Sequence, residues 1–468
     1  MDVNDDDRTA RGPRRSASWS QRDARAHGTL RDVTSTRATN LTERMTDALD
    51  RCFTMDFSTL ARVHGELDER AIPDALRALS QRHPLLSARV IRRAGLATQF
   101  ALGEAPPIAL SFRDAQDAWA SFSYRHRVWD DAGPRGVLDV VRHGPHERTF
   151  VLTLHHLVSD GRSGVMVMRD LLRLLGEPGR ALPPVESPGQ AAYYPEPVRG
   201  WRRLRPTLAA LSAMQRPPQP VRLRPDALAT PDESEVVVRP IVIDPERTEA
   251  LTRAARETGA TLHGLVSAAL AMAVAREMER GEVVLDVMHP VDLRRRVPEM
   301  PRDVVGYYVS SVSTRLRTDP AGDPLALARE ATNGVRRAID AGEHWTSAPG
   351  GGAVIVAATQ LMGRALTSSL LPKHVFTGAL AVTNLGVLEQ LGLEHAYGPL
   401  EVRACGFAAA PSILGSLLAA VSTFRGTLTI AVGHTVPLIS RERGERIAAH
   451  TEEILARAAD RAALSLAG

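Results

Sequence analysis

Hydrophobic and polar residues recur along the chain with two different periods, which together predict a mixed fold. Ile72, Leu76 and Leu79 recur at helical spacing and predict a helix within residues 68–84. Residues 305–317 alternate between apolar and polar positions, which is typical of a strand. Helices and strands intermixed in this way favour an α/β or α+β fold with mixed sheets.

The same two periods predict most of the remaining elements. Strands are expected at residues 60–67, 85–91, 149–155, 234–243, 282–296, 379–389 and 426–435, the fifth and sixth of which run into turns. Helices are expected at residues 163–175, 244–259, 261–278 and 440–464. The helix at 163–175 carries one apolar stripe, as expected of a helix packed on a sheet.

Changes in composition predict how the chain is divided. Residues 1–38 carry charges of both signs and lack apolar periodicity, so we expect a disordered tail or, alternatively, a docking arm. Residues 179–234 are rich in proline, which prevents long regular elements. We expect them to connect an N-terminal subdomain at 39–178 to a C-terminal subdomain at 235–468, since 468 residues exceed the usual size of one core.

Two segments leave open whether the chain meets a membrane. Residues 200–216 predict a short Trp- and Arg-containing helix that either packs on the body or lies on a membrane or partner surface. Residues 350–371 are apolar but contain Arg364, so a buried helix is favoured over a membrane span. The charged N-terminus does not resemble a secretory signal, and we expect a cytoplasmic protein.

Cysteine and charge exclude several classes of protein. Cys52 and Cys405 are far apart in sequence and form no CxxC pair, so neither a zinc site nor a disulfide framework is expected. The formal net charge is +4 with a pI near 9.4. Lys373 is the only lysine, and the arginines are scattered, so we expect no binding to nucleic acid.

The stretch LTLHHLVSDGRSG, residues 152–164, concentrates reactive groups at the end of a predicted strand. Successive strand residues face opposite sides, so only one of His155 and His156 can face a given cavity. A histidine there can act as a general base. Asp160 either caps the following helix or holds the turn through a buried ion pair, and Gly161 permits the turn or a close approach.

Three other interpretations of this stretch are weaker. A structural histidine pair with a helix cap is the simplest, but the four-residue combination is rare by chance. A metal site is disfavoured because adjacent strand histidines diverge and no third ligand stands at a familiar spacing. A serine hydrolase is disfavoured because Ser159 lies in no GxSxG motif.

These residues match the HHxxxDG motif, by which the chain resembles the superfamily of acyl-thioester-dependent acyltransferases. That superfamily includes chloramphenicol acetyltransferases and peptide condensation domains. The segments LDERAIPDALRALSQRHPLLSARV, TLHGLVSAALAMAVA, VMHPVDLRRRVP and VGYYVSSV also look like it, over about residues 42–460. VTNLGVLE is most similar to the branch of polyketide-associated acyltransferases and alcohol acetyltransferases.

The resemblance implies a fold and roles for the motif. It implies two chloramphenicol-acetyltransferase-like subdomains, arranged as a pseudo-dimer around a central tunnel. His156 would be the base and His155 structural. Asp160 would form a structural salt bridge, with Arg294 as first choice of partner and Arg82 as second. Gly161 would allow the turn and the approach of the donor's pantetheine arm.

The resemblance also implies a reaction. VTNLG replaces the DFGWG of condensation domains, which favours an ester product, and Thr383 or Asn384 either donates to the oxyanion or merely ends a strand. We expect transfer from acyl-CoA or an acyl-phosphopantetheine carrier protein to a small-molecule alcohol. No permanently bound cofactor or metal is expected, and the protein is expected to be a monomer. An amine acceptor, a long-chain wax-ester activity, another reaction on the same fold and a non-catalytic carrier-docking module remain as alternatives.

Overall fold

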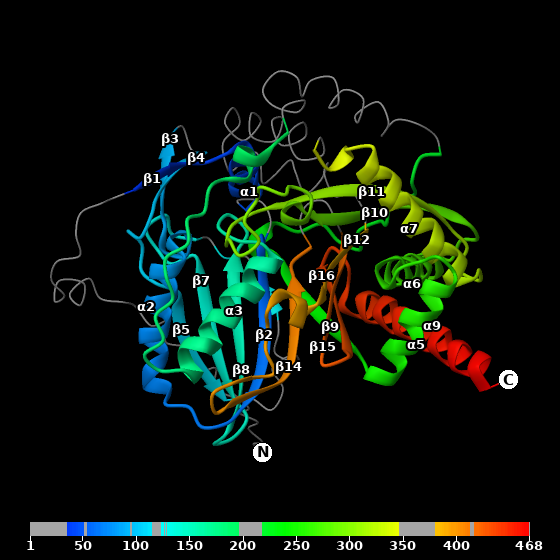
Figure 1. Cartoon of the computed structure of the whole chain (residues 1–468). Coiled ribbons are helices and arrows are strands. Elements are labelled where there is room, and N and C mark those ends of the chain that lie inside the picture. Colours follow the sequence, from blue (N-terminus) through cyan, green and yellow to red (C-terminus); the bar gives the residue numbers. More distant parts are fainter. Residues whose placement is uncertain are drawn as a thin grey trace, which may run out of the picture. The chain divides into compact units, whose positions relative to one another are not determined.

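Two large β-sheets with helices packed against them make up most of the described chain (Figure 1). The computed structural model describes residues 35–50, 54–93, 96–114, 123–125, 127, 129–195, 218–345, 380–411 and 416–467. Contacts place the residues from Ser35 onward in one unit. The mixture of helices and strands confirms the predicted α/β class. The central tunnel stays a prediction.

The first sheet has six strands in the order β13-β14-β2-β8-β7-β5. They are β2 (Asp56–His64), β5 (Ala109–Asp114), β7 (Gly136–Arg142), β8 (Glu147–His155), β13 (Ala396–Tyr397) and β14 (Leu400–Ala409). Helices α2 (Ile72–Arg82) and α3 (Gly161–Gly176) share its core. All but two positions of β8 are buried, although only one face of the strand is mainly apolar, so both faces are covered by the rest of the protein.

The predicted strand at 60–67 starts earlier and ends earlier, because β2 stops at His64. Gly65 follows with a φ of 144°, and a β-carbon on it would lie 2.0 Å from the carbonyl oxygen of Pro399. Only glycine therefore lets the chain turn away there beside the segment before β14. This contact is long-range, so the local pattern could not indicate it.

A smaller sheet has the order β1-β4-β3, and helix α1 follows its first strand. Its elements are β1 (Thr36–Ala38), α1 (Leu41–Asp50), β3 (Arg89–Arg93) and β4 (Leu96–Ala101). The tail predicted to end at residue 38 is therefore wrong at its last residues, because residues 36–38 pair with β4. Residues 1–34 lie outside the described residues.

The second sheet has seven strands in the order β11-β10-β12-β15-β16-β9-β6. They are β6 (Ser123–Arg125), β9 (Glu235–Ile243), β10 (Val283–Asp292), β11 (Val309–Thr318), β12 (Leu380–Val387), β15 (Leu417–Phe424) and β16 (Thr427–Val436). The helices on it are α5 (Pro245–Glu257), α6 (Leu262–Glu277), α7 (Pro324–Asp340) and α9 (Arg441–Ala467). Residues 264–275 of α6 are all buried, which explains its lack of a polar face.

Each large sheet contains a strand from the other half of the chain. β14 pairs antiparallel with β2, so the first sheet includes residues 400–409. β6 pairs antiparallel with β9, so the second sheet includes residues 123–125. The predicted boundaries at 39–178 and 235–468 therefore do not fully separate the two sheets, because each range contributes at least one strand to the sheet of the other. Two helices considered from the sequence, at 200–216 and 350–371, lie outside the described residues.

Among the described residues, no helix is by itself long and apolar enough to span a membrane. Among these helices, α5 and α6 would be long and apolar enough only if they were taken together, but they are bent by 96° relative to each other.

Candidate active site

The histidine motif spans the end of β8, a short turn and the start of α3. Asp160 has extended backbone geometry, and its Oδ1 accepts hydrogen bonds from the backbone N–H of Ser163 at 2.8 Å and from its hydroxyl at 2.9 Å. An aspartate that satisfies the first N–H groups in this way is a favourable N-cap. The helix therefore begins immediately after the turn, at Gly161.

Asp160 also forms a buried ion pair with Arg294, which follows β10 in the other half of the chain. Arg294 Nη1 lies 2.9 Å from Asp160 Oδ2, and neither side chain is exposed. Burial opposes the charge on Asp160, but the guanidinium and the backbone donors outweigh it and lower the pKa of the carboxyl group. Arg82, the alternative partner considered from the sequence, binds Asp170 instead at 2.6 Å. Asp160 thus performs both tasks that the sequence left open.

Gly161 makes a close approach, but to the protein itself. Gly161 is not one of the described glycines with a positive φ, so the backbone conformation does not require glycine here. A β-carbon on it would lie 2.9 Å from a ring carbon of Phe407 in β14 and 3.2 Å from Leu385 Cδ2 in β12. Phe407 and Leu385 occupy the space that a side chain would take, so packing requires glycine here, and the approach of a donor arm stays a prediction.

His155 faces a group of carboxylates. Its Nδ1 accepts the backbone N–H of Leu157 at 3.1 Å, and its Nε2 lies 2.9 Å from Asp50 Oδ1. Asp56 stands directly opposite on β2 and accepts the indole N–H of Trp129 at 3.0 Å. Burial opposes a charge on His155, but Asp50 and Asp56 outweigh it and raise the pKa of the imidazole.

The same three groups are close enough to consider as metal ligands. One ligand atom each from Asp50, Asp56 and His155 lies within 4.8 Å of the others. Because His155 Nδ1 already accepts an N–H, Nε2 must carry the ring proton, and a metal there would require an imidazolate. The cluster therefore fits a contact between the Nε2–H of His155 and the Asp50 carboxylate better than a metal site.

His156 has a different environment. Its Nδ1 lies 3.2 Å from the carbonyl oxygen of Ser159, which can only accept, so Nδ1 carries the proton and Nε2 keeps a lone pair. The ring packs against Phe57 at 4.7 Å between centroids and meets the edge of Tyr307 at 5.7 Å. Burial, followed by the neighbouring His155, lowers the pKa of His156 to about 4. The ring is therefore neutral at neutral pH, and His156 keeps some solvent-accessible surface.

Thr383 and Asn384 lie in β12, where it pairs parallel with β15. Asn384 Oδ1 accepts the backbone N–H of Gly386 at 2.7 Å, and the register shifts at this point. The strand-ending turn expected at this point is wrong, because β12 continues to Val387 and Asn384–Gly386 form an irregularity within the strand. Leu385 lies beside Gly161, so this irregularity is close to the motif.

The sequence did not single out Phe57 or Tyr307, which enclose the ring of His156. Phe57 comes from β2 and Tyr307 from the loop between β10 and β11. Tyr307 stands in the stretch VGYYVSSV, whose alternation indicates a strand and says nothing of which ring it meets. Asp50 and Asp56 were equally hidden, because neither belongs to a motif.

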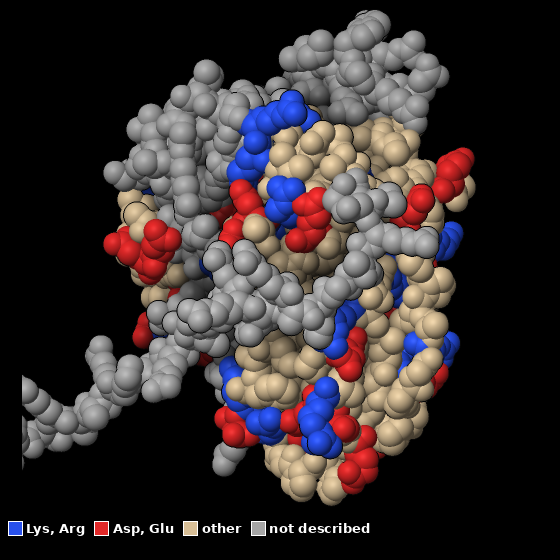
Figure 2. Space-filling model, turned by 90° about the vertical axis from the view of Figure 1, so that its left-hand side faces the viewer, with Lys and Arg blue, Asp and Glu red and all other residues tan. Residues whose placement is uncertain are grey.

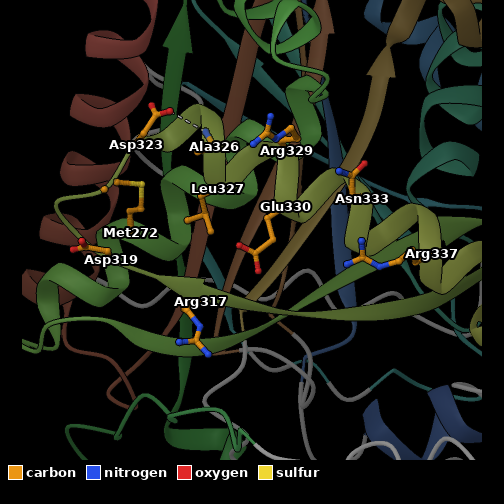
Figure 3. Close-up of a pocket in the computed structure, with 11 residues that line it drawn as sticks. Met272, Arg317, Asp319, Asp323, Ala326, Leu327, Arg329, Glu330, Asn333 and Arg337 are labelled. Carbon is orange, nitrogen blue, oxygen red and sulfur yellow. Dashed lines mark hydrogen bonds between the residues drawn. The ribbon is translucent and has the colours of Figure 1, made fainter.

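A separate cavity of about 450 Å³ lies between α7 and the end of β11 (Figure 3). Figure 3 shows Arg317, Arg329, Glu330 and Arg337 around it. No motif residue lines it. Arginines and carboxylates alternate there, so it favours no single charge of ligand. The described atoms of the face in Figure 2 likewise show basic and acidic groups side by side.

The chain is similar to a known protein family and to parts of several peptide synthetases. Residues 232–433 match the family model described as "Phthiocerol/phthiodiolone dimycocerosyl transferase C-terminus". One subunit of the linear gramicidin synthase of Brevibacillus parabrevis is 28% identical over 289 residues, which cover 58% of this chain and 4% of that protein. A probable non-canonical nonribosomal peptide synthetase of Salinispora arenicola is 30% identical over 286 residues, which cover 56% of this chain and 4% of that protein. The chain thus spans a small part of these curated relatives.

Two solved structures have a similar fold. Polyketide synthase associated protein 5 from Mycobacterium tuberculosis superposes with a TM-score of 0.61 at 17% identity, covering 91% of this chain and 98% of that one. The trichothecene 15-O-acetyltransferase TRI3 from Fusarium sporotrichioides gives 0.67 at 13% identity, with coverages of 90% and 94%. At these identities the likeness concerns the fold.

Proposed function

Because the fold is similar to those of polyketide synthase associated protein 5 and TRI3, and residues 232–433 match a transferase family model, we propose that the chain is an acyltransferase of natural-product or lipid biosynthesis. It moves an acyl group from a thioester, on coenzyme A or a carrier protein, to a hydroxyl acceptor. The observation that carries the proposal is the tautomer of His156. Ser159 binds the protonated nitrogen, so the lone pair of Nε2 is available as a base.

The reaction proceeds in two steps. His156 Nε2 takes the proton of the hydroxyl as its oxygen attacks the thioester carbonyl, and a tetrahedral intermediate forms. The carbon–sulfur bond then breaks, and His156 returns the proton to the leaving thiolate. The new ester and the free thiol leave with no net change in the enzyme.

The surroundings of His156 favour this exchange. The low pKa keeps the ring neutral before the reaction. When the ring becomes an imidazolium, the Ser159 carbonyl and the negative charges of Asp160 and Asp50 stabilise it, since all three favour its protonated form. Because burial still keeps the pKa at about 4, the proton is held weakly enough to be returned.

The oxyanion of the intermediate needs a donor. The amide oxygen of Asn384 is engaged by Gly386, which leaves its N–H groups as the donor side of the group. We assign this role to Asn384 or to the hydroxyl of Thr383, both on the strand beside the motif.

An amine acceptor is the second candidate. It is favoured by the similarity to the Salinispora arenicola protein, which is described as a nonribosomal peptide synthetase. The VTNLG sequence, which replaces the DFGWG of condensation domains, favours the alcohol. A non-catalytic docking module is disfavoured because it has no need for the lone pair that the Ser159 contact keeps on His156.

Release of free thiol tests the proposal. The purified protein is given acyl-CoA and acyl-carrier thioesters with paired alcohols and amines, and compared with His156→Ala. His146→Gln serves as the matched control, because His146 is an exposed histidine paired with Glu66. Acceptor-dependent release that is lost only in His156→Ala supports the mechanism, and the productive acceptor decides between ester and amide. Equal release in wild type and His156→Ala overturns the role of His156.

A further inference from the structure

The loop between β10 and β11 belongs to the second half of the chain, yet it carries Tyr307 to the histidine of the first half. The rings of Tyr307 and His156 meet edge to face, with centroids 5.7 Å apart and an interplanar angle of 89°. Phe57 packs against the imidazole as well, at 4.7 Å. The imidazole is thus held by one aromatic ring from each half of the chain.

The backbone on both sides of Tyr307 is fixed by the motif. The N–H of Tyr308 donates to Asp160 Oδ2 at 2.8 Å. The N–H of Gly306 donates to the hydroxyl of Ser163 at 3.1 Å. Arg294, the partner of Asp160, donates to the carbonyl of Val304 at 2.9 Å. Asp160 and Arg294 therefore fix the backbone position from which the Tyr307 side chain projects.

The far end of the Tyr307 side chain is fixed too. Its hydroxyl is hydrogen-bonded to Thr46 of α1. The Thr46 hydroxyl donates to the carbonyl of Thr42 at 3.0 Å, so it can accept from Tyr307. Burial raises the pKa of Tyr307 to about 12, so the phenol stays protonated near neutral pH and is unsuited to proton transfer.

We propose that Tyr307 is a positioning residue, which holds the ring of His156 in the orientation that presents Nε2 to the acceptor. The proposal rests on the function of His156 proposed above. It gives the ion pair of Asp160 and Arg294 a second task, because that pair anchors the loop on which Tyr307 stands. The catalytic base is then assembled only when both halves of the chain are in place.

The imidazole of His156 can rotate unless its neighbours hold it. The contact of Nδ1 with the Ser159 carbonyl fixes one end of the ring at 3.2 Å, and Phe57 supports it from one side. Without the edge of Tyr307 the other side is open, and alternative ring orientations become accessible. A misplacement of about 1 Å can lower the rate about 100-fold.

Four variants separate the ring of Tyr307 from its hydroxyl. Tyr307→Phe keeps the ring, and Tyr307→Leu removes it. Thr46→Val removes the acceptor of the hydroxyl without touching the ring. Tyr308→Phe is the matched control, because the hydroxyl of Tyr308 binds the carbonyl of Pro188 and leaves His156 untouched.

The first readout does not depend on any substrate. Protein labelled with ¹³C at the histidine Cε1 position is titrated by NMR, and the signal of His156 is assigned by its loss in His156→Gln. In Tyr307→Leu, water reaches the ring, and its pKa is expected to rise from about 4 toward the ordinary 6.5. Tyr307→Phe, Thr46→Val and Tyr308→Phe are all expected to titrate as the wild type does, because each keeps the ring of Tyr307.

The second readout is kinetic, with the thioester and acceptor found by thiol release. Tyr307→Leu is expected to lower kcat about 100-fold with little change in KM, while Tyr307→Phe stays within a few-fold of wild type. An unchanged titration and kcat in folded Tyr307→Leu would overturn the proposal. So would Tyr307→Phe being as damaging as Tyr307→Leu, because the hydroxyl would then be the active part. If no thioester is consumed, the proposed function fails, but the titration still decides on Tyr307.

Discussion

The two faces of the sheet at the end of β8 have opposite chemistry, although the adjacent residues His155 and His156 point to them. His155 faces two carboxylates that raise its pKa, whereas His156 faces two aromatic rings and a carbonyl, and burial lowers its pKa. The alternation of a strand is sufficient to send neighbouring imidazoles into these separate surroundings. The comparison teaches that one histidine supports the fold and the next is prepared to accept a proton.

Alanine at each histidine is expected to break this comparison most strongly. His156→Ala removes the base, and kcat is expected to fall about 10²- to 10⁴-fold with little loss of stability. His155→Ala leaves Asp50 and Asp56 without their imidazole, and the free energy of unfolding is expected to fall by about 3–5 kcal/mol. Thiol release and urea unfolding of both variants check the contrast. Equal effects on both measurements would show that the two sides are not specialised.

Breaking the ion pair beneath the motif is expected to have the next largest effect. Arg294→Met leaves Asp160 charged and fully buried, which costs about 3–5 kcal/mol of stability. The double variant with Asp160→Asn keeps a capping side chain and removes the stranded charge, so it should recover part of this loss. Urea midpoints of both variants measure the difference. A double variant that is less stable than Arg294→Met contradicts this account.

Acid is expected to act on His156 first through stability. Its pKa is about 4 in the folded chain and near 6.5 when unfolded, so the folded state binds fewer protons. Stability is therefore lost as the pH falls from 6.5 to 4, by about 2–3 kcal/mol from this group. His156→Gln should lose less stability over this window. The acidic limb of kcat/KM should lie below pH 5, and a limb near 6.5 would contradict the buried base.

The carboxylate side is expected to respond with the opposite sign and a smaller size. Burial, together with the charge of Asp50, raises the pKa of Asp56 to about 6, so the folded state binds its proton more tightly than the unfolded chain does. Stability from this group is present below pH 4 and is lost as the pH rises to 6. Asp56→Asn should flatten the unfolding free energy across that window by about 1–2 kcal/mol. If the free energy of unfolding of Asp56→Asn and of the wild type changed with pH in the same way, Asp56 would not be the group responsible.

Local patterns predicted most helices and strands, because burial on one face produces a period that the sequence retains. The helix at 163–175 corresponds to α3, and the strand at 234–243 to β9. The strand expected at 85–91 is partly wrong. Pro84–Ser87 form a 3-10 turn, because Pro84 lacks an N–H, and β3 starts at Arg89.

The sequence predicted the residues of the candidate site that belong to short motifs. HHxxxDG and its resemblance to a family identified His156, Asp160 and Arg294 as a group, and the structure brings the last two into contact. The contacts of Phe57 and Tyr307 with His156 could not be predicted, because each of these residues lies more than 90 positions from His156 in the sequence. Pairing of β14 with β2 could not be predicted for the same reason, since a strand pattern does not indicate its partner.

The exchange of β6 and β14 between the sheets has a consequence for protein engineering. A chimera that joins residues 1–217 of this chain to the second half of a relative would import a foreign β14 into the first sheet, beside β2. It would also lay this chain's β6 against a foreign β9. Since Phe407 of β14 packs directly on Gly161, even the motif would meet a ring it was not matched to. A recombination that respects the fold therefore has to move residues 123–125 and 396–409 together with the sheet that they complete.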